Sequence, residues 1–280
     1  MASQSSVPYG PCQAEGPLPK LPGWKLNFDA YENGCDSETA QDYLRNVAAV
    51  AAANETKARL DVVVLGDSLT AHAASLYPDA WDEAFEGLDA LPLGVYGNSI
   101  HELAWQLLFG GLKLAVAPRV VVVFVGINDL QYGRTAEQAA ERLDWLLSWL
   151  AATWPTSDFL LQALLPHAEL DVGPANEELA ALAAEHGAGF STCGADLDPS
   201  DAQQYTDKVH LAEEGYRRFL PCLRAEAEAL LAADRCGAGG APGPAPSASA
   251  STSERSFVGG PGEQAGAEVA AAPATEWQGS

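Results

Sequence analysis

The stretch Leu60–Leu69, which reads L-D-V-V-V-L-G-D-S-L, decides the fold. Its β-branched apolar run is typical of a parallel strand buried on both faces, and Gly66 ends that run. Ser68 follows just past the carboxyl end of the expected strand. Ligands bind at this edge of open α/β sheets, because the loops there carry chemistry while the strands hold them rigid. Ser68 is therefore a candidate nucleophile by position, although G-D-S-L also suits a turn followed by a helix N-cap.

Strands and helices alternate along the rest of the chain. We expect further strands at residues 91–96, 120–125, 159–165 and 190–193, and helices at 38–54, 98–108, 135–154, 175–185 and 213–234, with a helical segment after Ser68. The run Val120–Val125 is the most strongly apolar and is predicted to be a central strand. Such alternation gives right-handed crossovers and helices on both faces of the sheet. The sequence therefore predicts an α/β fold, a three-layer α/β/α sandwich with a parallel sheet.

Composition divides the chain into three segments. Residues 1–36 are rich in Pro, Gly and polar residues and are predicted to be an extended N-terminal arm. Residues 37–236 carry the periodic pattern and are predicted to be one domain, which suits a chain of 280 residues. Residues 237–280 are dominated by Gly, Ala, Pro and Ser, so we predict a disordered tail.

The charge of the chain excludes one class of partner. The formal net charge is −23 and the pI is about 4.3. Binding a phosphate backbone needs clustered Lys and Arg, so no nucleic-acid partner is expected.

No apolar run approaches the ~20 residues that a membrane helix needs. The first residues show neither a basic nor an apolar signal region, which predicts a cytoplasmic protein, or a secreted one if the N-terminus is incomplete.

Cysteines and histidines give no sign of a metal site. There is no C-x-x-C pair and no Cys/His ligand spacing, so we expect no metal and no cofactor. An odd count of five cysteines in a chain this long fits reduced, unpaired thiols, with one or two bridges in an oxidising compartment left open. Outside the block that ends at His210, we interpret the histidines as structural or surface residues. His72 is close enough to Ser68 in sequence to line a pocket.

A base and a carboxylate that could serve Ser68 follow the last expected strand. Asp207-Lys208-Val209-His210 places a carboxylate and an imidazole three residues apart. A serine nucleophile needs a base with a pKa near neutrality, and a carboxylate to fix the tautomer of that base. His210 and Asp207 fit these roles. Taken alone, the same spacing also suits an N-cap followed by a surface histidine.

Two residues after other strands could stabilise an oxyanion. Gly97 would let a backbone N–H approach a substrate without a Cβ in the way, and Asn128 offers a side-chain amide. A simple turn at Gly97 and an Asx-turn at Asn128 are the structural alternatives. Ser68, Gly97 and Asn128 follow separate parallel strands at the same edge of the sheet, which favours a shared site.

Four sequence blocks in this order resemble the SGNH hydrolases, also called GDSL esterases and lipases. The blocks are Gly66-Asp67-Ser68-Leu69, Gly97, Gly126-Ile127-Asn128-Asp129 and Asp207-Lys208-Val209-His210. The resemblance covers about residues 60–233 and implies a flavodoxin-like sandwich. It also implies that Ser68 is the nucleophile, His210 the base and Asp207 its orienting carboxylate, with the amides of Ser68, Gly97 and Asn128 as oxyanion donors.

Three further segments look most like one branch of that family, the catalytic subunits of intracellular platelet-activating-factor acetylhydrolase. They are Leu93–Gly97, His101–Trp105 and Leu164–Pro166. The chain departs from the family pattern at two positions: Ala212 stands where a hydroxyl residue is usual, and Asn98 replaces the usual residue after the glycine. Both departures leave the three candidate catalytic residues intact.

The leading functional hypothesis is a serine esterase that hydrolyses a short acyl or acetyl ester of a lipid or sugar through an acyl-enzyme. A lipase, lysophospholipase or thioesterase with a longer acyl pocket is the alternative enzyme. A catalytically silent binding protein is the third candidate, because the fold alone would permit it. The expected partner is a small-molecule or lipid ester, and a homodimer is left open.

Overall fold

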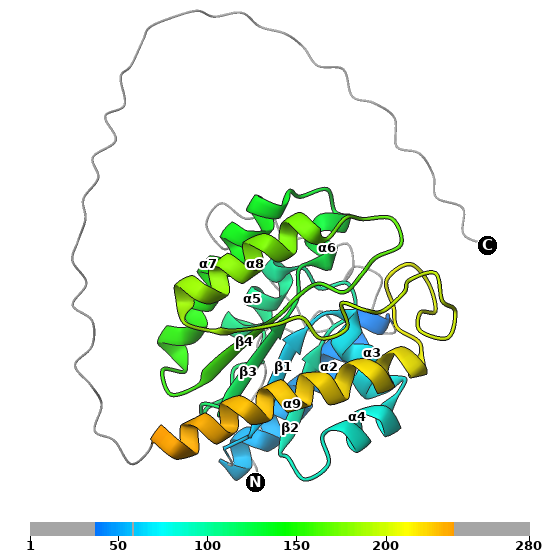
Figure 1. The fold of residues 1–280 in the computed structure, drawn as a ribbon. Coiled ribbons are helices and arrows are strands. Elements are labelled where there is room, and N and C mark those ends of the chain that lie inside the picture. The colour runs from blue at the N-terminus through cyan, green and yellow to red at the C-terminus, as the bar shows by residue number, and fades with distance from the viewer. Residues whose placement is uncertain (1–36, 58, 238–280) are drawn as a thin grey trace, which may run out of the picture. The chain divides into compact units, whose positions relative to one another are not determined.

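Five short parallel strands form the centre of the computed structural model, which describes residues 37–57 and 59–237 (Figure 1). They are β1 (Val62–Gly66), β2 (Ala90–Gly94), β3 (Val120–Phe124), β4 (Asp158–Gln162) and β5 (Gly189–Ser191). Their order across the sheet is β2-β1-β3-β4-β5, and every neighbouring pair is parallel. This is the flavodoxin-like order, so the predicted fold class is confirmed.

Helices cover both faces of the sheet. They are α2 (Glu38–Thr56), α3 (Ser68–Ser75), α4 (Pro78–Ala84), α5 (Ile100–Leu108), α6 (Ile127–Gln131), α7 (Ala136–Thr153), α8 (Gly173–His186) and α9 (Glu213–Gly237). Alternate residues of a strand point to opposite faces. Accordingly Val63 and Val121 pack in one core with α2, α5, α7 and α8. Val62 and Val120 pack in the other core with α3, α4 and α9.

The direction of strand addition reverses between β1 and β3, which lie side by side at the middle of the sheet. In doubly wound sheets the crevice at the carboxyl ends of such a strand pair is the usual ligand site. Helix α3 approaches β2 closely at this end, since a Cβ on Gly94 would lie 2.3 Å from the backbone nitrogen of Ala71. Glycine is thus required there by close packing.

The observed elements differ from the expected ones mainly at their ends. Strand β2 stops at Gly94, so Gly97 lies in the loop three residues beyond the strand rather than at its end. The segment after Ser68 contains two helices, α3 and α4, because Pro78 begins a new helix. Helix α5 starts at Ile100. The predicted arm, and the predicted tail from residue 238 on, lie outside the described residues.

Two cysteines within the described residues are paired. Cys193, in the loop after β5, and Cys222, in α9, form a disulfide with a Cα–Cα distance of 5.7 Å. The prediction of unpaired thiols was therefore wrong for these two residues. The two cysteines are 29 positions apart in the sequence, and only the packing of α9 on the sheet brings them together.

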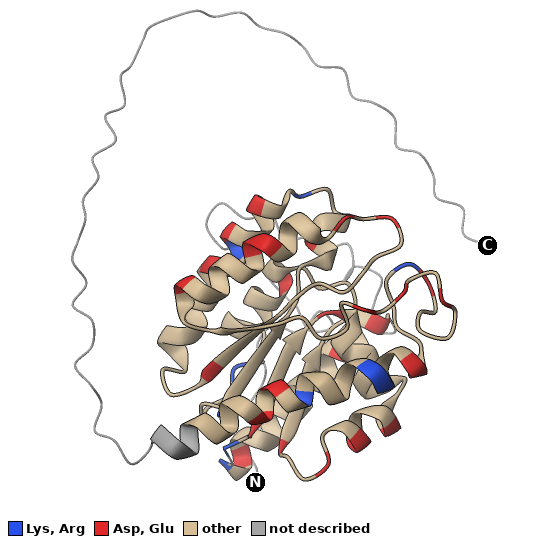
Figure 2. Cartoon of the chain, viewed as in Figure 1, with Lys and Arg blue, Asp and Glu red and all other residues tan. Residues whose placement is uncertain are grey.

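Two further features of the described helices are the distribution of their charged residues and their length. Along the ribbon of Figure 2, positions coloured for Asp and Glu are more widespread than those coloured for Lys and Arg. Within residues 37–57 and 59–237, no helix is both long enough and apolar enough to cross a lipid bilayer.

Candidate active site

Ser68 lies where β1 turns into α3. Asp67 caps that helix, and its side chain accepts a hydrogen bond of 3.0 Å from the backbone nitrogen of Leu69. Ser68 is the first residue of the helix, so its N–H has no intrahelical carbonyl to bind and is available to a ligand. The residue is only 3% exposed, which places the hydroxyl in a largely water-excluded setting.

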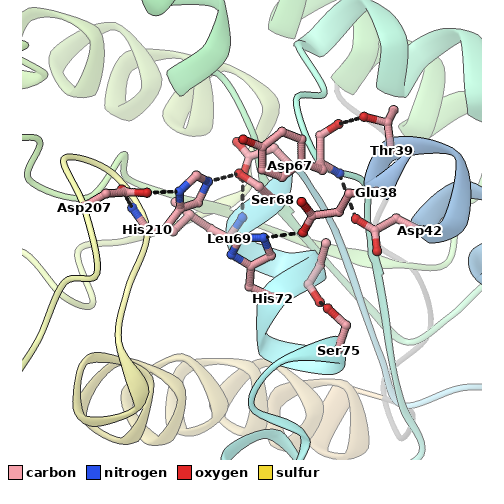
Figure 3. Close-up of polar contacts among 12 residues, drawn as sticks. Glu38, Thr39, Asp42, Asp67, Ser68, Leu69, His72, Ser75, Asp207 and His210 are labelled. Carbon is pink, nitrogen blue, oxygen red and sulfur yellow. Dashed lines mark hydrogen bonds and ion pairs between the residues drawn. The ribbon is translucent and has the colours of Figure 1, made fainter. Parts of the chain in front are cut away.

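Ser68, His210 and Asp207 form a hydrogen-bonded row, which Figure 3 shows. The Nε2 atom of His210 lies 2.9 Å from Ser68 Oγ, and its Nδ1 atom lies 2.7 Å from Asp207 Oδ2. Oδ1 of Asp207 accepts hydrogen bonds from the backbone nitrogens of Val209 and His210, at 2.8 and 2.7 Å. The structure thus brings together three residues that are up to 142 positions apart in the chain.

The charge state of Asp207 follows from these contacts. Partial burial raises the pKa of its carboxyl, but hydrogen bonds from the backbone and ring of His210 and from the Val209 N–H lower it by more. The net pKa lies below the ordinary value of 3.8, so Asp207 carries its charge at neutral pH. An ionised carboxylate on Nδ1 fixes the His210 tautomer that leaves Nε2 free to accept a proton from Ser68.

The pKa of Asp67, the neighbour of Ser68, shifts in the opposite direction from that of Asp207. Asp67 is buried, and one of its carboxylate oxygens, Oδ2, has no hydrogen-bond partner among the described residues. Burial raises its pKa to about 7, and the negative charge of Asp129 adds to this, against the lowering effect of the Leu69 N–H. We interpret Asp67 as the cap that shapes the turn before Ser68.

Gly97 and Asn128 reach the same edge of the sheet. Gly97 has a φ of 77°, a left-handed conformation that favours glycine, and a Cβ there would come no closer than 3.8 Å to any atom. The Asn128 amide donates to the carbonyl of Asn98 at 2.8 Å, which leaves its second N–H for a ligand. This contact ties the loop after β3 to the loop after β2. The Asn98 amide in turn donates to the Gly66 carbonyl at 3.5 Å, so the loops after β1, β2 and β3 are tied together.

Sequence reasoning missed a cluster of rings beside His210. The rings of His72 and Tyr96 lie 4.7 and 5.7 Å from that of His210, and His72 Nε2 lies 2.9 Å from Glu38 Oε1. Burial lowers the pKa of His72 and the charge of His210 lowers it further, while Glu38 opposes both. The sequence had singled out His72 as a residue that could line a pocket near Ser68, which it follows by four residues on the same face of α3, but it gave no sign of the contacts with Tyr96 and His210.

One cluster among the described residues brings potential metal ligands within reach of one another, namely Cys193, Cys222 and Glu226. The two sulfurs are bonded to each other, so neither is a thiolate that could bind a cation. The residues of the cluster lie in the loop after β5 and on α9, far from Ser68 in the sequence. We assign no metal to it.

Comparisons with known proteins identify the family and support the fold. A family model described as GDSL-like lipase/acylhydrolase matches residues 64–218. The chain is 31% identical over 196 residues to the bovine platelet-activating factor acetylhydrolase IB subunit alpha1, covering 65% of this chain and 81% of the relative. It is 30% identical to the human protein of that name over 189 residues, covering 62% and 78%. The crystal structure of a GDSL-like lipase from Bacteroides thetaiotaomicron superimposes with a TM-score of 0.53 at 20% identity, covering 67% of this chain and 97% of that one.

Proposed function

The chain belongs to the GDSL-like lipase and acylhydrolase family, and on this premise we propose that it is a serine esterase with Ser68 as nucleophile. The family makes the protein an ester hydrolase of the GDSL type. The proposal adds the residues that carry the reaction and the class of ester. The observation that supports it most directly is the row Ser68–His210–Asp207, with contacts of 2.9 and 2.7 Å.

Acylation begins at Ser68. As its Oγ attacks the ester carbonyl, His210 Nε2 takes the hydroxyl proton and Asp207 stabilises the resulting imidazolium. The tetrahedral intermediate collapses when the bond to the alcohol breaks, and His210 returns the proton to the leaving alkoxide. Water then attacks the acyl-enzyme with His210 again as base, which releases the carboxylic acid and restores Ser68.

Three donors are available for the developing oxyanion. They are the N–H of Ser68 at the start of α3, the N–H of Gly97 and the second N–H of the Asn128 amide. Fixed donors of this kind act only as charge develops on the oxygen, and they therefore accelerate the reaction without tightening substrate binding.

The proposed substrate is a short acyl ester, an acetyl ester in particular, of a lipid or sugar. Two relatives at 30–31% identity are named acetylhydrolase subunits, which supports a short acyl group. Tyr96 and Tyr132 flank Gly97 and are 37% and 46% exposed. Their rings offer an apolar surface to the part of the substrate that lies outside the acyl site.

Labelling with a fluorophosphonate probe tests the nucleophile. The adduct should map to Ser68 and disappear in Ser68→Ala. Ser75→Ala is the matched control, because Ser75 lies on the same helix and its hydroxyl donates to the Ala71 carbonyl at 2.9 Å. Labelling that survives in Ser68→Ala would refute the assignment.

A series of p-nitrophenyl esters from acetate to palmitate tests the acyl length. We expect kcat/KM to be highest for the shortest esters. A maximum at long chains would favour the lipase, lysophospholipase or thioesterase alternative instead. A protein that neither labels nor hydrolyses any ester would be a binding protein on this fold.

A further inference from the structure

We infer that helix α2 positions the oxyanion loop, and that the hydroxyl of Thr39 aims the N–H of Gly97 at the substrate. The inference rests on the proposed function, because it assigns a role within that site. Nothing in the family blocks quoted above includes α2, which precedes the first of them in the chain.

Side chains of helix α2 bind the backbone that follows β2, where no neighbouring strand of the described chain pairs with it. Among the described residues, strand β2 is at the edge of the sheet and pairs only with β1, and its ladder ends at Gly94. The backbone that continues toward Gly97 therefore has no strand to bind. Side chains of α2 contact it instead: the Asn46 amide donates to the Gly94 carbonyl at 2.7 Å, and Asp42 Oδ2 accepts from the Tyr96 nitrogen at 3.1 Å.

Thr39 completes this set of contacts. Its hydroxyl donates to the Tyr96 carbonyl at 3.2 Å. Residues 39, 42 and 46 recur at helical spacing, so they share one face of α2. All three are at most 5% exposed. Buried polar side chains that all bind one loop indicate that this face of the helix serves to hold the loop.

The Tyr96 carbonyl belongs to the same peptide unit as the Gly97 N–H. A peptide unit is planar, and in the trans form its C=O and N–H point in opposite directions. No peptide bond in the described chain is cis. Fixing the Tyr96 carbonyl toward Thr39 therefore fixes the Gly97 N–H to point away from α2. A hydroxyl that donates to the carbonyl also polarises the amide and strengthens its N–H as a donor.

The remaining polar groups of this loop are already bound. The Gly97 carbonyl accepts from the Tyr132 hydroxyl at 3.3 Å, and the Asn98 nitrogen donates to the Val95 carbonyl at 3.2 Å. The Asn98 carbonyl accepts from Asn128. Among the backbone groups of residues 96–98, the Gly97 N–H is the one without a partner in the described part of the chain. The loop is thus held on every side except where an oxyanion would bind.

The same turn of α2 also contacts the base side of the site. Glu38 binds His72 (Figure 3). The His72 ring packs against the rings of both Tyr96 and His210. Neighbouring residues of one helix therefore contact the oxyanion loop and the ring beside the base. This places α2 as a brace between the two halves of the site.

Thr39→Val tests the inference, because it removes the hydroxyl and keeps the shape of the side chain. We expect kcat for p-nitrophenyl acetate to fall about tenfold with KM nearly unchanged. The loss should be smaller than the 10²- to 10³-fold that follows removal of a whole oxyanion donor, because the Gly97 N–H is misdirected and not deleted. A trifluoromethyl ketone, which forms a tetrahedral adduct with a serine, should bind more weakly by a similar factor.

Two variants serve as controls. Thr39→Ser keeps the hydroxyl and should restore most of kcat. Thr56→Val makes the same change in the last turn of α2, where the hydroxyl donates to the Ala53 carbonyl at 2.9 Å, and should leave kcat unchanged. The equal loss of activity in Thr39→Val and Thr39→Ser would overturn the inference, and so would a kcat of Thr39→Val within twofold of the wild type.

A second pair covers the case in which Thr39→Val does not fold. Asp42→Ala removes the acceptor for the Tyr96 N–H and should lower kcat, whereas Asp42→Asn keeps an acceptor oxygen and should not. Equal activity of this pair would also overturn the inference. Wild-type hydrolysis that Ser68→Ala abolishes would uphold the proposed function whatever these variants do, and its absence would refute both proposals together.

Discussion

Replacing Asn128 by alanine should slow the reaction far more than it weakens the fold. The amide has two N–H groups, and one of them donates to the Asn98 carbonyl at 2.8 Å. If the other donates to the oxyanion, Asn128→Ala should lower kcat by about 10²- to 10³-fold, or about 2.7–4 kcal/mol, with little change in KM. The buried Asn98 carbonyl also loses its donor, which should cost about 1–3 kcal/mol of folding stability.

Both effects can be measured on one preparation. Thermal unfolding should show a Tm lowered by about 2–12 °C, since 1 kcal/mol shifts the Tm of a domain this size by about 2–4 °C. Assays well below that Tm then give kcat per folded molecule. Asn176→Ala is the matched control, because that amide donates to the Leu164 carbonyl at 3.0 Å and should affect stability alone. A destabilised Asn128→Ala with kcat within fivefold of the wild type would remove Asn128 from the oxyanion site.

Two further predictions concern the loop that carries the base. The disulfide between Cys193 and Cys222 closes a loop of 29 residues. Replacing both cysteines by serine should therefore lower the free energy of unfolding by about 3.5 kcal/mol and the Tm by about 7–14 °C. A change in Tm under about 3 °C by calorimetry would contradict this. Because the pKa of Asp207 lies below its ordinary value, its ionised form stabilises the fold above about pH 4, and this contribution is lost as the pH falls through the lowered pKa. Urea unfolding between pH 2 and 6 should therefore depend less on pH in Asp207→Asn, and equal pH dependence would show that the contacts of this carboxylate contribute no stability.

The sequence predicted the parts of the fold that depend on local pattern. The apolar runs at β1 and β3 placed two neighbouring strands, and the alternation with helices predicted the parallel sheet that the structure has. Ser68 lies two residues beyond β1 and Asn128 four residues beyond β3, so their common edge could be predicted from the strands. Gly97 lies three residues beyond β2, because that strand ends at Gly94 and not at residue 96 as expected.

Contacts between distant segments were not accessible in the same way. The disulfide depends on how α9 packs across the sheet, and the spacing of two cysteines carries no information about that packing. The ring cluster of His72, Tyr96 and His210 likewise combines three segments of the chain. A sequence motif contains the residues that react. The residues that position them can lie anywhere in the sequence where the fold places a buried polar side chain beside the site.

This difference explains why the helix α2 was predicted but its role beside the site was not. Its sequence shows only amphipathic periodicity, which predicts a helix packed on the domain and nothing about chemistry. Thr39, Asp42 and Asn46 are ordinary helix residues until the structure shows that all three contact the backbone between Gly94 and Gly97. An edge strand leaves the backbone beyond its end without partners, and each buried N–H or C=O left unpaired would cost about 1–3 kcal/mol. A site built after an edge strand therefore needs an external brace, and polar residues buried on a neighbouring helix are the feature by which such a brace is recognised.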